Sequence, residues 1–68
     1  MEEREKLKHL LEHWIEHNEE HATEFREWAT KAKSLGETAV SDQILEAANQ
    51  LEKANEFLGN ASEKMSGS

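Results

Sequence analysis

The sequence contains no cysteine and no proline, and only three of its 68 residues are glycine. Without cysteine the chain has neither disulfide bonds nor thiolate metal ligands. The usual means of stabilising so small a fold therefore reduce to oligomerisation or to a metal bound by nitrogen and oxygen ligands. The lack of proline and a composition rich in glutamate, alanine, lysine, leucine and asparagine favour an all-helical chain.

Basic residues are also scarce, with 8 lysines and arginines against 15 aspartates and glutamates and a formal net charge of −7. This charge opposes binding to nucleic-acid backbones and to anionic membrane surfaces. No apolar run approaches the roughly 20 residues that span a bilayer, and residues 1–8 are too charged for a secretory signal. We therefore expect a cytoplasmic protein that binds neither nucleic acid nor membrane.

The first apolar pattern predicts a helix over residues 3–35. Its core positions follow one another at spacings of four and three residues: Leu7, Leu11, Trp14, Asn18, His21, Phe25, Trp28 and Ala32. This is the a/d pattern of a helix that packs against another helix. Gly36 stands where a left-handed C-terminal cap is needed, and Lys31 and Lys33 complement the helix dipole in the last turns.

A second apolar pattern predicts a helix from residue 39 to residue 58 or beyond, with Thr38 as its N-cap. The same spacing connects Val40, Ile44, Ala47, Leu51, Ala54, Leu58, Ala61 and Met65. Gly59 and Asn60 are candidates for the end of this helix. Residues 1–65 are expected to form one helical domain, and residues 66–68, Ser-Gly-Ser, a flexible tail.

Two helices joined by so short a connection must lie antiparallel, which predicts a helical hairpin in which residue i faces roughly residue 73 minus i. In this register Asn18 faces Asn55, a polar pair of the kind that fixes register at a cost in stability. Trp14 faces Gly59, where the missing side chain leaves space for the indole. The aromatic side chains are expected in the core, namely Trp14, Phe25 and Trp28, with Phe57 on its flank.

The apolar arc of the first helix is too wide for one partner helix to cover. On a helical wheel this arc is extended on one side by Leu10, Trp14 and Trp28, and on the other by Ile15, Ala22 and Ala29. The sequence therefore predicts a homodimer that forms a four-helix bundle.

The distinctive chemistry of the chain is a histidine ladder on the first helix. It consists of His9, His13, His17 and His21, four residues apart, each followed three residues later by a glutamate: Glu12, Glu16, Glu20 and Glu24. Residues three and four apart are neighbours on a helix, so two adjacent imidazoles can hold one metal ion. Because steps of four residues drift by about 40° around the helix, burial is expected to rise from His9 to His21.

The ladder predicts a metal site near its buried end, with His17 and His21 as the best pair. The candidate ligands are His13, His17, His21, Glu20 and Glu24. Imidazole and carboxylate ligands suit a divalent transition metal, and zinc or nickel is expected.

Two other interpretations of the ladder remain open. Each histidine can pair with its glutamate on a solvated face, which suits His9 best and His21 least, because a titratable group at a core position carries a desolvation cost. Alternatively the ladder senses pH, since protonation of all four histidines would change the net charge from −7 to −3.

The ladder also contains the string HxxEH three times, which matches the signature of inverzincin metalloproteases. Any series of Glu-His pairs at four-residue spacing produces this string, and a hairpin offers neither a substrate cleft nor a distal third ligand. Dinuclear carboxylate bundles use the order ExxH on paired helices, whereas the order here is HxxE and the second helix has no histidine. An enzyme is therefore not favoured.

The run from Leu11 to Ala29, LEHWIEHNEEHATEFREWA, resembles a motif of short uncharacterised α-helical domains of archaea and bacteria. Its most specific residues are His13, Trp14, His17, Asn18 and His21. The resemblance implies an α-hairpin fold and no particular activity.

These observations favour a small non-enzymatic protein that binds a transition metal through the ladder, for storage, delivery or sensing. The alternative is an acidic helical module for protein interaction or oligomerisation, without metal, in which the histidines tune the surface charge and the partner is a second copy or another protein.

Overall fold

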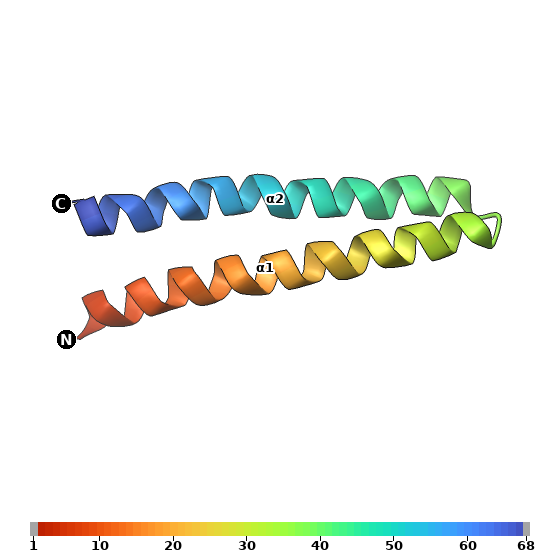
Figure 1. Ribbon diagram of the computed structural model, residues 1–68. Coiled ribbons are helices and arrows are strands. Elements are labelled where there is room, and N and C mark those ends of the chain that lie inside the picture. The colour runs from red at the N-terminus through yellow and green to blue at the C-terminus, as the bar shows by residue number, and fades with distance from the viewer. Residues whose placement is uncertain (1, 68) are drawn as a thin grey trace.

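The computed structural model describes residues 2–67 as two long antiparallel helices joined by a short turn (Figure 1). Helix α1 comprises Glu3–Ser34 and helix α2 comprises Thr38–Gly67. The two helices form a rod with principal extents of 51 × 16 × 11 Å. The predicted helical hairpin is thereby confirmed, and the described residues contain no strand.

The turn between the helices is closed by Gly36, as the sequence predicts. Gly36 has a φ of 86°, and its N–H donates to the Lys33 carbonyl at 3.0 Å while the Glu37 N–H donates to the Ala32 carbonyl at 2.9 Å. This pair of hydrogen bonds is the Schellman arrangement of a helix C-terminus. The Glu37 carbonyl then accepts the Ser41 N–H at 2.9 Å. The N-cap of α2 is therefore Glu37, one residue before the predicted Thr38, because the chain re-enters helix directly after the glycine.

Helix α2 continues through Gly59 and Asn60 and includes Ser66 and Gly67. A glycine inside a helix costs only about 1 kcal/mol relative to alanine, and the apolar spacing continues beyond it at Ala61 and Met65. Ser68 lies outside the described residues, so the flexibility expected of the tail stays a prediction.

The contact between the helices is made by small side chains. Its buried residues are Leu11, Ala22, Ala29 and Ala32 of α1 with Ser41 and Ala48 of α2. Alanine and serine let two helix backbones approach closely, and leucine is the single large residue among these six. The predicted core of α1 is therefore correct for Leu11 and Ala32, but Ala22 and Ala29 belong to the centre of the contact and not to its flank.

The predicted register is confirmed by a pair of asparagines. Asn18 Nδ2 donates to Asn55 Oδ1 at 3.0 Å, and Asn55 Nδ2 donates to the Ile15 carbonyl at 3.0 Å. Both side chains are partly buried. The predicted contact of Trp14 with Gly59 is wrong, since a Cβ placed at Gly59 would meet nothing within 4 Å.

The prediction that the tryptophans form the core of the hairpin is also wrong. Trp14 is 41% exposed and Trp28 is 53% exposed, while Phe57, expected on the flank, is 73% exposed. Phe25 is half-buried. The tryptophans lie beside the contact because the helix turns its alanines, which permit the closest approach, toward α2.

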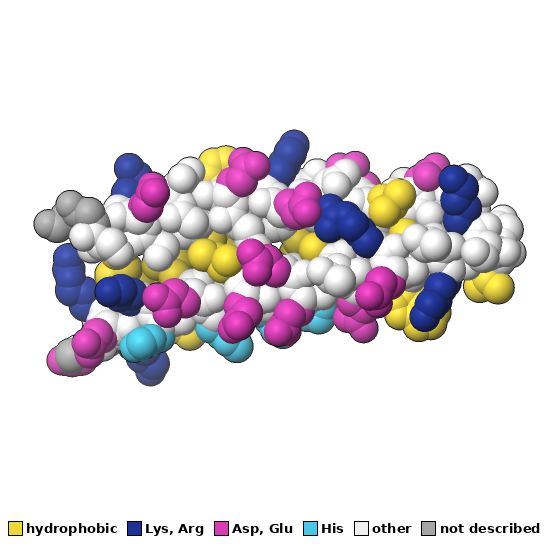
Figure 2. Space-filling view, viewed as in Figure 1, with side chains coloured by type: hydrophobic (Ala, Val, Ile, Leu, Met, Phe, Trp, Pro, Cys, Tyr) yellow, Lys and Arg dark blue, Asp and Glu magenta, His cyan; other side chains and the backbone are white. Residues whose placement is uncertain are grey.

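Charged side chains from both helices are spread over one broad face of the rod, with hydrophobic side chains visible between the helices (Figure 2). Between the helices, Arg26 contacts Glu52 at 2.8 Å (Nη2 to Oε2) and Asn49 at 3.5 Å. We call the side on which these residues lie the charged face.

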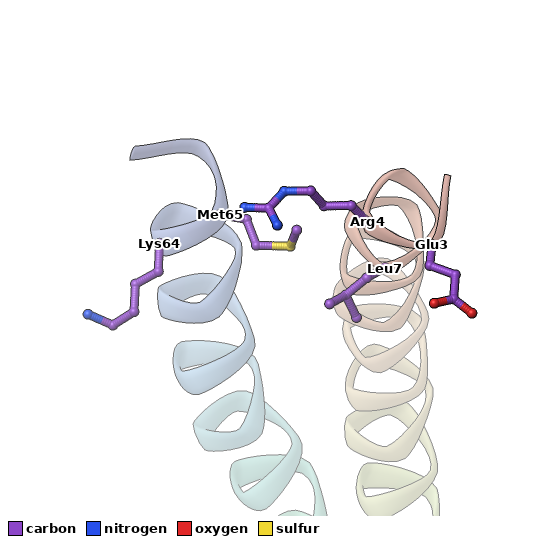
Figure 3. A pocket seen from close by; sticks show the side chains of 5 residues that line it. All are labelled: Glu3, Arg4, Leu7, Lys64 and Met65. Carbon is purple, nitrogen blue, oxygen red and sulfur yellow. The ribbon is translucent and has the colours of Figure 1, made fainter. Parts of the chain in front are cut away.

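The helices diverge toward the two chain ends (Figure 1). Leu7 and Met65 line a shallow pocket there, together with Glu3, Arg4 and Lys64. Figure 3 shows Leu7 and Met65 pointing into the space between the helices and Arg4 extending across it toward α2. The groove between the helices is therefore open at this end of the rod.

Candidate functional site

The histidine ladder follows one edge of α1, where imidazole and carboxylate side chains alternate (Figure 2). The rings of His13 and His17 are stacked, with centroids 5.6 Å apart and an interplanar angle of 13°. The rings of His17 and His21 are closer, at 4.5 Å, and nearly perpendicular, at 81°. The helix thus brings the rings of His13, His17 and His21 next to one another along the stripe that the spacing predicts.

Burial rises along the ladder, as predicted. The side chain of His9 is 77% exposed, whereas that of His21 is 45% exposed. His13 and His17 are exposed. The ring of His21 lies 6.0 Å from that of Phe25, which is half-buried beside the interhelical contact. His21 is therefore the member of the ladder with the most restricted surroundings.

Two of the four predicted histidine–glutamate pairs are close. His9 Nδ1 lies 3.9 Å from Glu12 Oε1, and His21 Nδ1 lies 3.7 Å from Glu24 Oε1. Both distances are too long for hydrogen bonds, and three of the four side chains are largely exposed, His21 being the exception. Such contacts contribute at most about 1 kcal/mol to stability.

The five predicted metal ligands do not meet at one point. Within residues 2–67, no three side chains of histidine, aspartate or glutamate are grouped so that they could hold a metal ion. His13 and His21 are eight residues apart, so a straight helix separates them by about 12 Å along its axis. Only neighbours come together: His13 with His17, His17 with His21, and His21 with Glu24. Glu20 lies on the exposed side of α1.

An exposed apolar row on α1 contains Trp14 and Trp28, which belong to the apolar arc that the sequence predicts to be too wide for one partner helix. The row consists of Leu7, Trp14 and Trp28, all exposed, and ends at the exposed C-cap residue Leu35, with the half-buried His21 at the third, central position of the same seven-residue spacing. Leu7 also lines the space between the helices at their open end. Residues seven apart are two turns apart on one face of a helix. The sequence contained one indication that this row would lie outside the interhelical contact. The small residues Ala22 and Ala29 form a neighbouring row on which a second helix can pack more closely.

Helix α2 continues this surface. A shallow groove is lined by Phe25 of α1 and by Ala39, Val40, Gln43, Ile44 and Ala47 of α2. Phe25 neighbours His21 of the exposed row. We call the combined surface the apolar face: Leu7, Trp14, Phe25, Trp28, Leu35, Val40, Ile44 and Ala47. None of these residues takes part in the Arg26–Glu52 ion pair that marks the charged face.

The fold and its surfaces define a small, acidic, all-helical hairpin domain with an exposed apolar face. Neither helix, over residues 2–67, has a stretch long and apolar enough to cross a membrane. The chain belongs to the family described as Domain of unknown function (DUF8180), which matches residues 7–65.

A relative from Archaeoglobus fulgidus, described as an uncharacterized protein, is 40% identical over 57 residues, which cover 84% of this chain and 90% of the relative. No solved structure matches the chain. The resemblance to short uncharacterised domains is confirmed at this level. That the histidine run is the signature of these domains stays a prediction.

Proposed function

We propose that this domain is a self-association module in which two hairpins pack through their apolar faces to form a four-helix bundle. The observation that supports it best is the exposure of Trp14 and Trp28 on the same face of α1. Tryptophans bury a large apolar area and are enriched at the energetic centres of protein interfaces.

The small core of a single hairpin supports the same proposal. Among the residues that the structure describes, five of the six buried ones are alanine or serine, and no large side chain is completely buried. A domain of this length rarely obtains more than a few kcal/mol from one core, and oligomerisation is a common additional source of stability. A second hairpin on the apolar face would supply the large buried side chains that the first one lacks.

The test is the mass in solution at micromolar concentration, by multi-angle light scattering or sedimentation equilibrium. We expect twice the chain mass, and we expect Trp28→Gln to weaken association at least tenfold, about 1.4 kcal/mol. Leu7 and Leu45 provide a matched pair, since they are 44% and 40% exposed. Leu45 lies seven residues before Glu52, on the side of the charged face.

Leu7→Gln is therefore expected to weaken the dimer, and Leu45→Gln to leave it unchanged. A monomer mass for the unaltered chain would contradict the proposal. Equal weakening by the two leucine substitutions would show that the apolar face is not the surface involved.

A second function, transition-metal binding by the ladder, is supported by the 4.5 Å separation of the His17 and His21 rings. Two imidazoles at positions i and i+4 can supply two of the ligands of a zinc or nickel site. The protein would then hold the metal for storage, delivery or sensing, without catalysis.

The metal proposal is tested by titrating EDTA-treated protein with zinc and with nickel. Calorimetry measures the affinity, and the NMR signals of the histidine rings show which imidazoles bind the metal. The double substitution of His17 and His21 by alanine is expected to abolish binding, and the same change at His9 and His13 to leave it nearly intact. Equal losses in the two variants would identify the ladder as a nonspecific charged surface.

A further inference from the structure

The exposed row of α1 has the same order of residue types in both directions. It runs Leu7, Trp14, His21, Trp28, Leu35, so leucine occupies both ends, tryptophan both intermediate positions and histidine the centre. A two-fold symmetric interface requires that when residue i contacts residue j of the copy, residue j contacts residue i of the copy. A row with this order is self-complementary in an antiparallel pairing about its central residue.

We infer that the proposed dimer has its two-fold axis at His21, perpendicular to α1, and binds a divalent transition metal with ligands from both copies. This inference rests on the proposed self-association. The axis pairs Trp14 with the partner's Trp28 and Leu7 with the partner's Leu35. It also places His21 beside the partner's His21.

Helix α2 places an apolar side chain at the same level. The Asn18–Asn55 hydrogen bond aligns the helices so that His21 is level with Glu52, next to Leu51. The half-buried row on this helix consists of Ile44, Leu51, Leu58 and Met65, and Leu51 is the member nearest to the axis. The two-fold axis therefore leaves Leu51 beside the partner's Leu51 and brings Ile44 near the partner's Leu58.

The two-fold symmetry also brings a third metal ligand, from the partner subunit, to the histidine pair of each chain. His17 and His21 are neighbours with rings 4.5 Å apart, and no third ligand joins them within residues 2–67 of the chain. His17 lies four residues before the axis and Glu24 three residues after it. In the antiparallel copy, the partner's Glu24 therefore lies within one residue of the level of His17, about 1.5 Å along the helix.

His17 and Glu24 are also seven residues apart on α1, so they share a stripe of the helix beside the exposed row. The proposed site consists of His17 and His21 of one chain and Glu24 of the partner subunit, with a second equivalent site across the axis. Two imidazoles and one carboxylate are a known zinc ligand set that leaves a fourth position for water. Zinc is therefore the first metal to test, and nickel the second.

The axis position is tested by disulfide formation, because the chain has no cysteine of its own. His21→Cys is expected to form a covalent dimer under mild oxidation, since each thiol faces its own copy. Leu7→Cys is the control, because the two thiols would be separated by 28 residues of helix, about 40 Å. Equal cross-linking of the two variants, or none at His21→Cys in a protein of dimeric mass, would overturn the axis.

The shared site is tested by mixing two defective variants. Glu24→Gln alone, and His17→Ala with His21→Ala in one chain, are each expected to lose at least tenfold in zinc affinity in calorimetric titrations. Mixing and re-equilibrating the two variants is expected to restore one tight site in each heterodimer, because one chain supplies both imidazoles and the other supplies the carboxylate. Glu20→Gln is the matched control, and it is expected to bind zinc as the unaltered chain does.

The outcomes separate the inference from the proposed function. A metal-free chain that sediments as a monomer would contradict both the proposed self-association and the shared metal site. A metal-free dimer whose variant mixture binds no better than its components would retain self-association and overturn the shared site. Loss of affinity in Glu20→Gln but not in Glu24→Gln would instead indicate a site within one chain, which also contradicts the inference.

Discussion

The asparagine pair makes a quantitative test of the hairpin register possible. Asn55 takes part in two hydrogen bonds, one with Asn18 and one with the Ile15 carbonyl, whereas Asn18 takes part in the first of these only. Replacement of either residue by alanine removes the bond between them, and replacement of Asn55 removes the other bond as well. The double substitution removes the same two bonds as Asn55→Ala alone.

The expected free energies follow from this count. A hydrogen bond contributes a net 0.5 to 1.5 kcal/mol, roughly, to stability. Asn18→Ala should therefore lower the free energy of unfolding by about 0.5 to 1.5 kcal/mol and Asn55→Ala by about 1 to 3 kcal/mol. The double variant should resemble Asn55→Ala, with a coupling energy of about 1 kcal/mol between the two sites.

The assay is urea unfolding of the four proteins at one fixed protein concentration, because the stability of an associating protein depends on concentration. Asn60→Ala serves as the control, since Asn60 is exposed on α2, and it should change stability by less than about 0.5 kcal/mol. Strictly additive effects of Asn18→Ala and Asn55→Ala would refute the argument, because they would mean that the two amides do not share a bond in solution.

Three further predictions concern the turn, the interhelical contact and the charged face. Gly36→Ala should destabilise the hairpin by about 1 kcal/mol in urea unfolding, because a φ of 86° is unfavourable for a residue with a Cβ even though nothing lies within 4 Å of that position. Ala48→Leu should cost about 1 to 3 kcal/mol, since Ala48 is fully buried between the helices, and an unchanged melting temperature would mean that the helices are farther apart than they lie in the structure. A double-mutant cycle on Arg26 and Glu52 should give a coupling below about 1 kcal/mol that falls as salt is added, because both side chains are substantially exposed.

The local features of the fold were predictable from the sequence because short-range patterns determine them. Gly36 follows the last turn of an apolar pattern, and a glycine at that position closes a helix through a positive φ. The length of the turn then fixes an antiparallel arrangement, and the register places Asn18 against Asn55. Each of these steps depends on neighbours in sequence or on one simple geometric consequence.

The side of α1 that meets α2 was not predictable with the same accuracy. Several adjacent rows of this helix are apolar, and the spacing of four and three residues fits more than one of them. The row with Trp14 and Trp28 appeared central because its side chains are the largest, but α2 packs on the row with Ala22 and Ala29. Close packing of two isolated helices favours small residues, whereas periodicity weighs only apolar character.

Only those features of the candidate site that depend on the geometry of a single helix were predictable from the sequence. The contact of His17 with His21 and the rise in burial toward His21 follow from helical geometry. Five ligands spread over the twelve residues from His13 to Glu24 of a straight helix cannot surround one ion, because each turn advances about 5.4 Å. Further ligands must therefore come from a second element, and α2 has no histidine with which to supply them.

The position of His21 in the middle of an exposed apolar row leads to a last prediction, which separates stability from function. A histidine between Trp14 and Trp28 would be partly desolvated in the proposed dimer, and a polar group in an interface lowers affinity unless it gains a partner. His21→Leu should therefore strengthen the metal-free dimer, since burial of a leucine side chain contributes about 1.5 to 3 kcal/mol, or at least about tenfold in the dissociation constant.

The same substitution should abolish zinc binding, because it removes one of the two imidazoles of each site. Sedimentation equilibrium without metal and a zinc titration of the same sample measure the two effects. A weaker metal-free dimer in His21→Leu would contradict the argument, because it would show that the imidazole stabilises the interface without a metal. A tighter dimer that no longer binds zinc would instead show that His21, at the centre of the interface, weakens association and is needed for the metal site.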